Sequence, residues 1–163
     1  MVSFGAPRPI MHNVFPALGG SDKMIRDVLL PALQSKFPNR DFRTDDSQNA
    51  IGTFPCAHEE VGDVTIWDDG DEATVGIGDI THGHFNPYDE NLTQEEVENR
   101  ITQEVVAFLT DLFADRVLLW KSPDGGSGGW RILGDDGRYS IMDSNNLTYL
   151  WSGPVRNPDI GAG

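Results

Sequence analysis

Two stretches of the chain place apolar residues at helical spacing. The first follows Ser21, which can cap a helix that begins at Asp22 and is kinked by Pro31. The second follows Thr93, which forms a capping box with Glu96 and predicts a long helix that ends near residue 114. The two apolar stripes comprise Met24, Ile25, Val28, Leu29, Ala32 and Leu33, and then Val97, Ile101, Val105, Phe108, Leu109 and Leu112. Each stripe is typical of a helix that packs one face against a core.

Strand patterns occupy much of the remaining chain. Residues 64–67 alternate in polarity, residues 68–71 have turn chemistry and residues 72–80 are rich in β-formers, so together they predict a hairpin. Gly76 and Gly78 share one face of its second strand, which indicates that another backbone, or less often a ligand, packs closely there. Shorter strands are predicted at residues 40–44, 117–120, 130–133, 139–142 and 147–151, and an irregular stretch leads up to Pro55.

The order of these elements predicts an α+β fold. Helices and strands alternate too rarely to build a parallel sheet, so we expect a mostly antiparallel sheet with one long and one kinked helix packed on one face. A chain of 163 residues is long enough for one continuous core. We therefore expect an irregular N-terminal segment over residues 1–20, a single domain over residues 21–151 and a flexible tail over residues 152–163.

The cysteine content and the N-terminus predict the compartment. The single cysteine, Cys56, cannot form an internal disulfide, which suits a reducing environment. Residues 1–20 lack the unbroken apolar run of a signal peptide or a membrane span, so we expect a cytoplasmic protein with no membrane partner. Cys56 lies two residues from His58, but because no third group orients the pair we expect a buried thiol rather than a nucleophile.

Acidic residues are distributed unevenly along the chain. The net charge is −14, and between Glu59 and Asp115 sixteen acidic residues face a single basic one, Arg100. This charge repels phosphate backbones, so we expect no nucleic-acid partner, whereas it speeds encounter with a basic protein. The candidate partner-binding residues are Asp68, Asp69, Asp71, Glu72, Glu96, Glu104 and Asp111. The simpler alternative is that the acidity only maintains solubility.

A second candidate site contains His82 and His84. A His-x-His pair can chelate a transition-metal ion from one strand face, with Asp79 or Asp89 as a further ligand. Such a site would form a metal-binding module, or a metal-dependent hydrolase in which metal-bound water is the nucleophile. The alternative is a loop in which both histidines hydrogen-bond to nearby carbonyls.

No complete catalytic constellation appears in the sequence. Residues 125–129 match the G-x-S-x-G pattern, but a strand follows them instead of a helix, and no histidine follows His84. The sequence therefore favours a non-catalytic protein that captures a basic partner such as a toxin or nuclease domain. In composition and general layout the chain is similar to small acidic immunity proteins that neutralise bacterial toxins. A structural subunit of a larger assembly is a third possibility, and the oligomeric state is left open.

Overall fold

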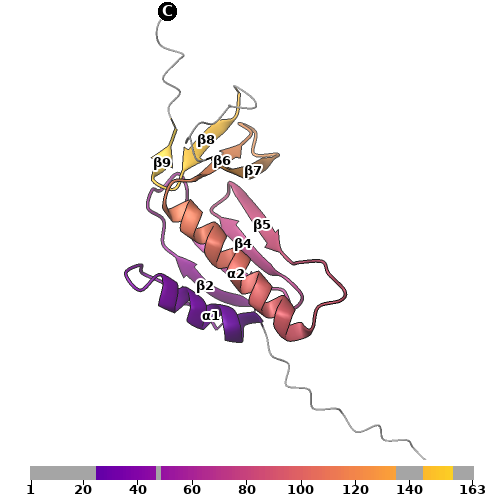
Figure 1. Ribbon diagram of the computed structural model, residues 1–163. Coiled ribbons are helices and arrows are strands. Elements are labelled where there is room, and N and C mark those ends of the chain that lie inside the picture. Colours follow the sequence, from indigo (N-terminus) through magenta and orange to yellow (C-terminus); the bar gives the residue numbers. More distant parts are fainter. Residues whose placement is uncertain (1–24, 47–48, 135–144, 156–163) are drawn as a thin grey trace, which may run out of the picture.

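The computed structural model describes residues 25–46, 49–134 and 145–155. In chain order its elements are α1 (Ile25–Lys36), β1 (Arg43–Thr44), β2 (Ala50–Phe54), β3 (Val64–Asp68), β4 (Ala73–Ile77), β5 (Thr81–Phe85), α2 (Gln94–Phe113), β6 (Val117–Lys121), β7 (Gly128–Ile132), β8 (Leu147–Leu150) and β9 (Gly153–Pro154). They form two helices and two antiparallel sheets (Figure 1), which confirms the predicted α+β class.

The first sheet contains β1 to β5 in sequence order, and both helices cover the same face of it (Figure 1). Burial alternates along β3, where Val64 and Ile66 are buried under the helices while Thr65 and Trp67 are half-buried on the opposite side. Strand register carries this alternation across the sheet, because directly paired residues point to the same face. The face turned away from the helices, called the open face below, carries Thr53, Thr65, Trp67, Thr74, Gly76, His82 and His84.

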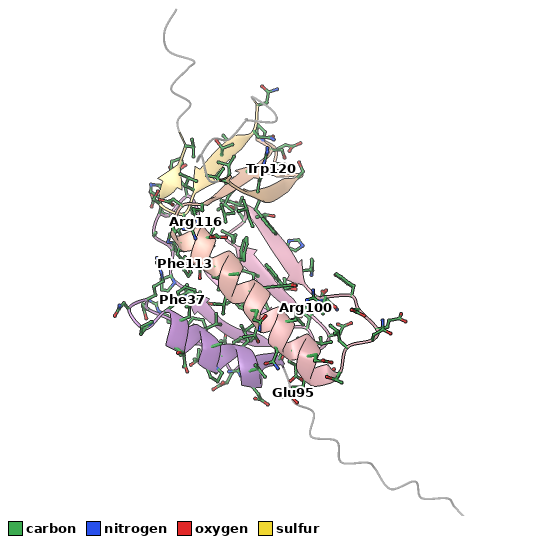
Figure 2. The ribbon with its side chains drawn as sticks, in the orientation of Figure 1. Phe37, Glu95, Arg100, Phe113, Arg116 and Trp120 are labelled. Carbon is green, nitrogen blue, oxygen red and sulfur yellow. The ribbon has the colours of Figure 1, made fainter. Side chains whose placement is uncertain are left out.

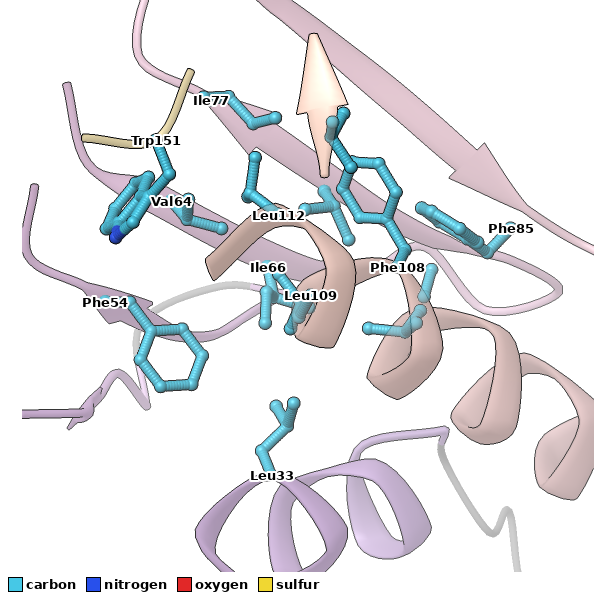
Figure 3. Packing of buried hydrophobic residues seen from close by; sticks show 14 of the residues in the cluster. Leu33, Phe54, Val64, Ile66, Ile77, Phe85, Phe108, Leu109, Leu112 and Trp151 are labelled. Carbon is cyan, nitrogen blue, oxygen red and sulfur yellow. The ribbon is translucent and has the colours of Figure 1, made fainter. Parts of the chain in front are cut away.

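The core lies between this sheet and α2. Leu109 and Leu112 of α2 pack toward Val64 and Ile66 of the sheet, with Leu33 of α1 closing one side (Figure 3). Full burial of such a side chain is worth about 1.5–3 kcal/mol relative to exposure. The apolar stripe predicted for the second helix is therefore confirmed as the buried face of α2, with its capping box in place.

The second sheet has the strand order β7-β6-β8-β9 and packs across the end of the first sheet at which α2 finishes (Figure 1). The Trp151 ring lies 5.1 Å from the Phe113 ring, and the Trp130 ring lies 4.7 Å from the Phe108 ring. Buried residues from both sheets therefore belong to one hydrophobic cluster. Gly128 allows the closest approach, since a Cβ atom at this position would lie 1.9 Å from the carbonyl oxygen of Ile80.

Several expectations need correction. Residues 50–54, expected to be irregular, form β2, and His82 and His84 lie on strand β5 instead of in a loop. Residues 153–154, assigned above to the tail, form β9. Pro31 lies within α1, whereas residues 21–24, the predicted strand over residues 139–142 and both chain ends lie outside the described residues. In the described part of the chain, neither helix is long and apolar enough to cross a membrane.

Gly76 lies on β4, whereas Gly78, expected on the same strand face, lies in the turn that follows β4. A Cβ atom at Gly78 would lie 2.2 Å from the carbonyl oxygen of Val61, so the expected close backbone approach is present there. At Gly76 the space is filled by a side chain, since a Cβ atom would lie 2.7 Å from the six-membered ring of Trp67. Gly76 thus lets an indole lie across the open face.

Candidate functional site

Acidic segments that are far apart in the sequence meet where β3 turns into β4. The side-chain amide of Asn86, after β5, donates to the backbone oxygen of Asp71 at 2.8 Å. Arg26 connects a further segment, because its guanidinium donates to the backbone oxygen of Asp45 at 2.8 Å and to the Asp46 carboxylate at 2.5 Å. We call this region the acidic end; its exposed or half-buried carboxylates belong to Asp45, Asp46, Asp69, Asp71, Glu72, Asp89, Glu90, Glu95 and Glu96.

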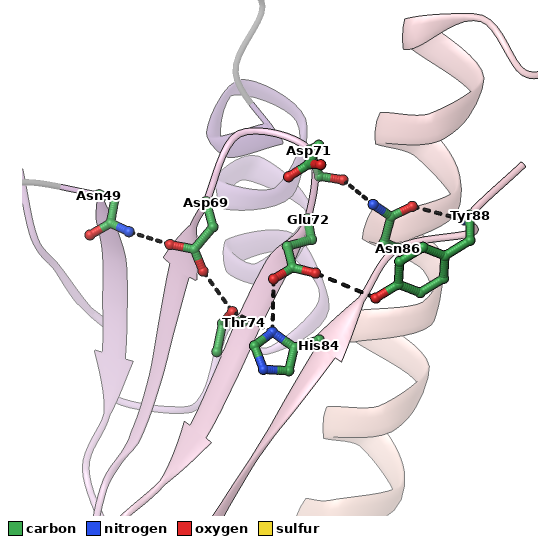
Figure 4. A network of polar contacts seen from close by, with 8 residues as sticks. All are labelled: Asn49, Asp69, Asp71, Glu72, Thr74, His84, Asn86 and Tyr88. Carbon is green, nitrogen blue, oxygen red and sulfur yellow. Dashed lines mark hydrogen bonds and ion pairs between the residues drawn. The ribbon is translucent and has the colours of Figure 1, made fainter. Parts of the chain in front are cut away.

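A hydrogen-bonded network fixes the carboxylates of Asp69 and Glu72 at the β3–β4 turn (Figure 4). The Thr74 hydroxyl donates to Asp69 at 2.6 Å, and the Asn49 amide donates to the other oxygen of Asp69. The Nδ1 atom of His84 lies 2.8 Å from Glu72 Oε1 and 3.2 Å from Thr74 Oγ1. Because ionised Glu72 can only accept and the Thr74 proton points to Asp69, Nδ1 of His84 carries the proton of this contact. The carboxylates are therefore held in position before any partner arrives.

Tyr88 is the most exposed of the large apolar side chains at the acidic end. Its side chain is 76% exposed, its hydroxyl lies 3.5 Å from Glu72 Oε2, and its backbone has a φ of 50°. The backbone N–H of Tyr88 donates to Asn86 Oδ1 at 2.8 Å, which holds this uncommon conformation for a bulky residue. An exposed aromatic ring beside a carboxylate is a typical anchor for a protein partner.

Few cations compensate the acidic end. Arg26 pairs with Asp46, and Arg100 acts electrostatically on Asp89. Glu72 pairs with a histidine, which is charged only when protonated. Among the described residues of this end, the carboxylates therefore outnumber the arginines beside them.

Asp68 does not belong to this exposed surface, although the sequence makes it a candidate for partner binding. Its side chain is buried, with one oxygen accepting the backbone N–H of Arg26 at 2.9 Å and the other accepting that of Gly70 at 3.0 Å. The first contact supplies an acceptor to the first turn of α1, where backbone N–H groups have no partner within the helix. Asp68 therefore has a structural role.

Glu96 occupies the capping box at the start of α2. It accepts the backbone N–H and the hydroxyl of Thr93, each at 2.8 Å. The backbone hydrogen bond from Thr93 is the main reason that the pKa of Glu96 is lowered. Its carboxylate is exposed and stays ionised, so it contributes charge to the acidic end as well as capping the helix.

The remaining acidic candidates of α2 lie away from the acidic end. Figure 2 shows Glu95 in the first turn of α2, Arg100 farther along and Arg116 beyond its last turn. Glu104 pairs with Arg100 at 3.7 Å, and Asp111 pairs with Arg116. These carboxylates are neutralised locally and form no single surface with residues 69–72.

The two candidate histidines line a groove on the open face. Their rings lie 5.0 Å apart and nearly perpendicular, both projecting from β5. The groove has a volume of about 780 Å³, and it extends from Asp69 and Thr74 at the acidic end, past Trp67 and Gly76, to the glycine-rich loop over residues 125–128. Ligand sites usually have volumes of roughly 300–1,000 Å³. The groove is large enough for several side chains of a partner or for a small molecule.

The structure does not bring the four proposed metal ligands together. Asp79 precedes β5 and Asp89 follows it, so they lie beyond opposite ends of the strand that carries the histidines. Lys121 donates to Asp79 at 2.9 Å, and this hydrogen bond lowers the pKa of Asp79 and raises that of Lys121. The backbone N–H of Asn91 donates to Asp89 and lowers its pKa. Within the described ranges, no group of three or more His, Cys, Asp or Glu residues has metal-binding geometry.

Two smaller expectations concern loops near the second sheet. Cys56 is exposed, so the expectation of a buried thiol is wrong; it lies in the loop after β2, where no core residue covers it. Ser127 lies in the turn between β6 and β7, and its backbone N–H donates to Ser122 Oγ at 3.0 Å. A strand follows this serine, as expected for a hairpin loop and not for a nucleophile elbow.

Sequence reasoning missed three contributors to the site. Tyr88 was missed because nothing in the local sequence indicates its exposure, and Asp46 because it lies outside the acidic segment. Trp67 lies in a predicted strand whose residues do not indicate its face, and the register of β3 turns it to the open face. In comparisons with known proteins, no family model matches the chain, and neither a curated protein nor a solved structure is similar to it at a significant level.

Proposed function

We propose that this protein is a non-catalytic binding protein that captures a basic partner, such as a toxin or nuclease domain, through its acidic end. The observation that carries the proposal is the convergence of separate acidic segments at one end of the first sheet, where Tyr88 is exposed beside Glu72. Carboxylates that are already hydrogen-bonded in place lose little side-chain entropy when a partner binds. We expect it to act in the cytoplasm as an immunity-type inhibitor, since its single cysteine needs no oxidising compartment.

Solubility alone is the competing explanation for the charge. A charge that serves only solubility needs no particular arrangement on the surface. The acidic end instead combines positioned carboxylates with an exposed aromatic ring, and this combination is characteristic of binding sites. The arrangement supports the capture proposal over solubility.

Transition-metal binding by His82 and His84 is the second candidate function. The 5.0 Å separation of their rings on one strand face supports it, because such a pair can chelate one ion. Asp79 and Asp89 would have to give up their bonds to Lys121 and Asn91, and would also have to move, to complete the ligand set. We therefore rank metal binding below protein capture.

The test compares two charge-matched double variants in affinity capture from the native lysate at low salt. Asp71→Asn with Glu90→Gln neutralises the acidic end, while the control, Glu59→Gln with Glu60→Gln, removes the same charge from the loop between β2 and β3 at the opposite end. All four side chains are exposed. The variants therefore differ in where the charge is lost, and not in how much is lost.

We expect wild type and control to retain a basic protein that salt elutes. The acidic-end variant should bind this protein with an association rate about two- to tenfold slower. An equal fall in association rate in both double variants would show that only total charge matters and would refute a defined binding surface. Near-equimolar transition metal in the purified protein, without any retained partner, would favour the histidine site.

A further inference from the structure

We propose that the groove on the open face binds an arginine side chain from an extended segment of the basic partner. This inference rests on the capture function proposed above and specifies how part of the partner is recognised. The groove begins at Asp69 and Thr74, which belong to the network of the acidic end (Figure 4), and continues along β4 and β5. A segment attracted to the acidic end would therefore have a continuous path into the groove.

Trp67 provides an aromatic surface inside the groove. It lies across Gly76, where a Cβ atom would come within 2.7 and 2.9 Å of two of its ring atoms, and it is one of the groove-lining residues. Because any side chain at position 76 would displace the ring, this glycine fixes the indole close to the strand. An indole is the strongest aromatic partner for a cation above its face.

Asp69 provides a positioned negative charge in the same groove as this indole. The register pairs Trp67 with Thr74, and the Thr74 hydroxyl donates to the Asp69 carboxylate at 2.6 Å. A carboxylate has about four acceptor positions, so the contacts from Thr74 and Asn49 leave capacity for a ligand. At the other end of the groove Asp79 is neutralised by Lys121, so the attraction for a cation is strongest near Asp69.

These features favour arginine over lysine. A guanidinium is planar, stacks on an aromatic ring and can donate two parallel hydrogen bonds to one carboxylate, whereas an ammonium is a strongly hydrated point charge. Phosphate and other anionic ligands are disfavoured by the carboxylates along the same face. Beyond the indole, the loop over residues 125–128 offers three glycines and one serine, so a partner backbone can approach closely there.

The experiment is a titration of the full-length, ¹⁵N-labelled protein with N-acetyl-arginine amide and, in parallel, with N-acetyl-lysine amide. We expect arginine to shift the indole N–H of Trp67 and the backbone N–H signals of Thr74 and Gly76, and lysine to bind about two- to fivefold more weakly. Trp67→Leu should abolish the difference between the two ligands. Trp120→Leu, in the second sheet and outside the groove, should preserve it.

Asp69→Asn gives an independent test if Trp67→Leu does not fold, since it removes charge without changing side-chain size; it should weaken arginine binding. Equal affinity for both amides, or shifts confined to signals around Tyr88, would overturn the inference. Perturbation of His82 and His84 by Zn²⁺ together with no response to arginine would also overturn it. If the salt-dependent partner is captured but arginine shifts no signals of the groove residues, this inference alone fails. If no partner is captured, the capture function fails as well.

Discussion

Replacing Asp68 by alanine tests whether a buried carboxylate connects α1 to the first sheet. The side chain is 4% exposed and accepts two backbone N–H groups, from Arg26 at 2.9 Å and from Gly70 at 3.0 Å. Loss of a helix-capping acceptor typically costs about 1 kcal/mol, and a hydrogen bond to a charged group contributes roughly 1.5–3 kcal/mol. We expect Asp68→Ala to lower the free energy of unfolding by about 2–4 kcal/mol.

Urea unfolding followed by circular dichroism measures this loss. The midpoint should fall without a change in the slope, because the surface exposed on unfolding is nearly unchanged. In a chain of this size the melting temperature should fall by roughly 5–15 °C. Asp68→Asn keeps one acceptor oxygen, so its free energy of unfolding should fall less than that of Asp68→Ala.

The control is Asp71→Asn, which removes an exposed carboxylate from the same turn and should stay within about 0.5 kcal/mol of wild type. A loss in Asp68→Ala no greater than in this control would refute the structural role of Asp68.

Two further predictions concern stability. Gly128→Ala should destabilise the protein by about 1–3 kcal/mol in the same urea assay, because its Cβ atom would lie 1.9 Å from the carbonyl oxygen of Ile80; wild-type stability would contradict the close approach of the two sheets. Glu96 has a pKa below its ordinary value of 4.5, so its contribution is fully present above that pH and is lost as the pH falls through the lowered folded-state pKa. Glu96→Gln should therefore reduce the acid-side slope of stability against pH, and an unchanged slope would count against the capping box.

The sequence by itself determined the elements whose signals are local. Thr93 and Glu96 are three residues apart and satisfy each other, so the start of α2 depends on no distant contact. The hairpin of β3 and β4 has its turn residues between two stretches with strand character, and this pattern is confirmed. The α+β class followed from the order of such elements.

Tertiary structure decided which strands form from weak local signals. β2 contains Gly52, which has no side chain of its own to pack, and the Phe42 ring lies where its Cβ atom would be. β5 alternates histidine with small and apolar residues, and it becomes a strand through pairing with β4 and through Trp130, which packs against Gly83. Neither stabilising contact is visible from the residues next to these strands.

Tertiary structure also decided the composition of the site. The sequence locates the carboxylates along the chain, but antiparallel strands send successive loops to opposite ends of a sheet, so one acidic segment is divided between two surfaces. Arg26 and Asn86 then bring residues 45–46 and 86–90 to the turn at 69–72 through hydrogen bonds between distant residues. Burial removed Asp68 from that surface and register added Trp67 to the open face, because the side on which a side chain emerges depends on its strand partners.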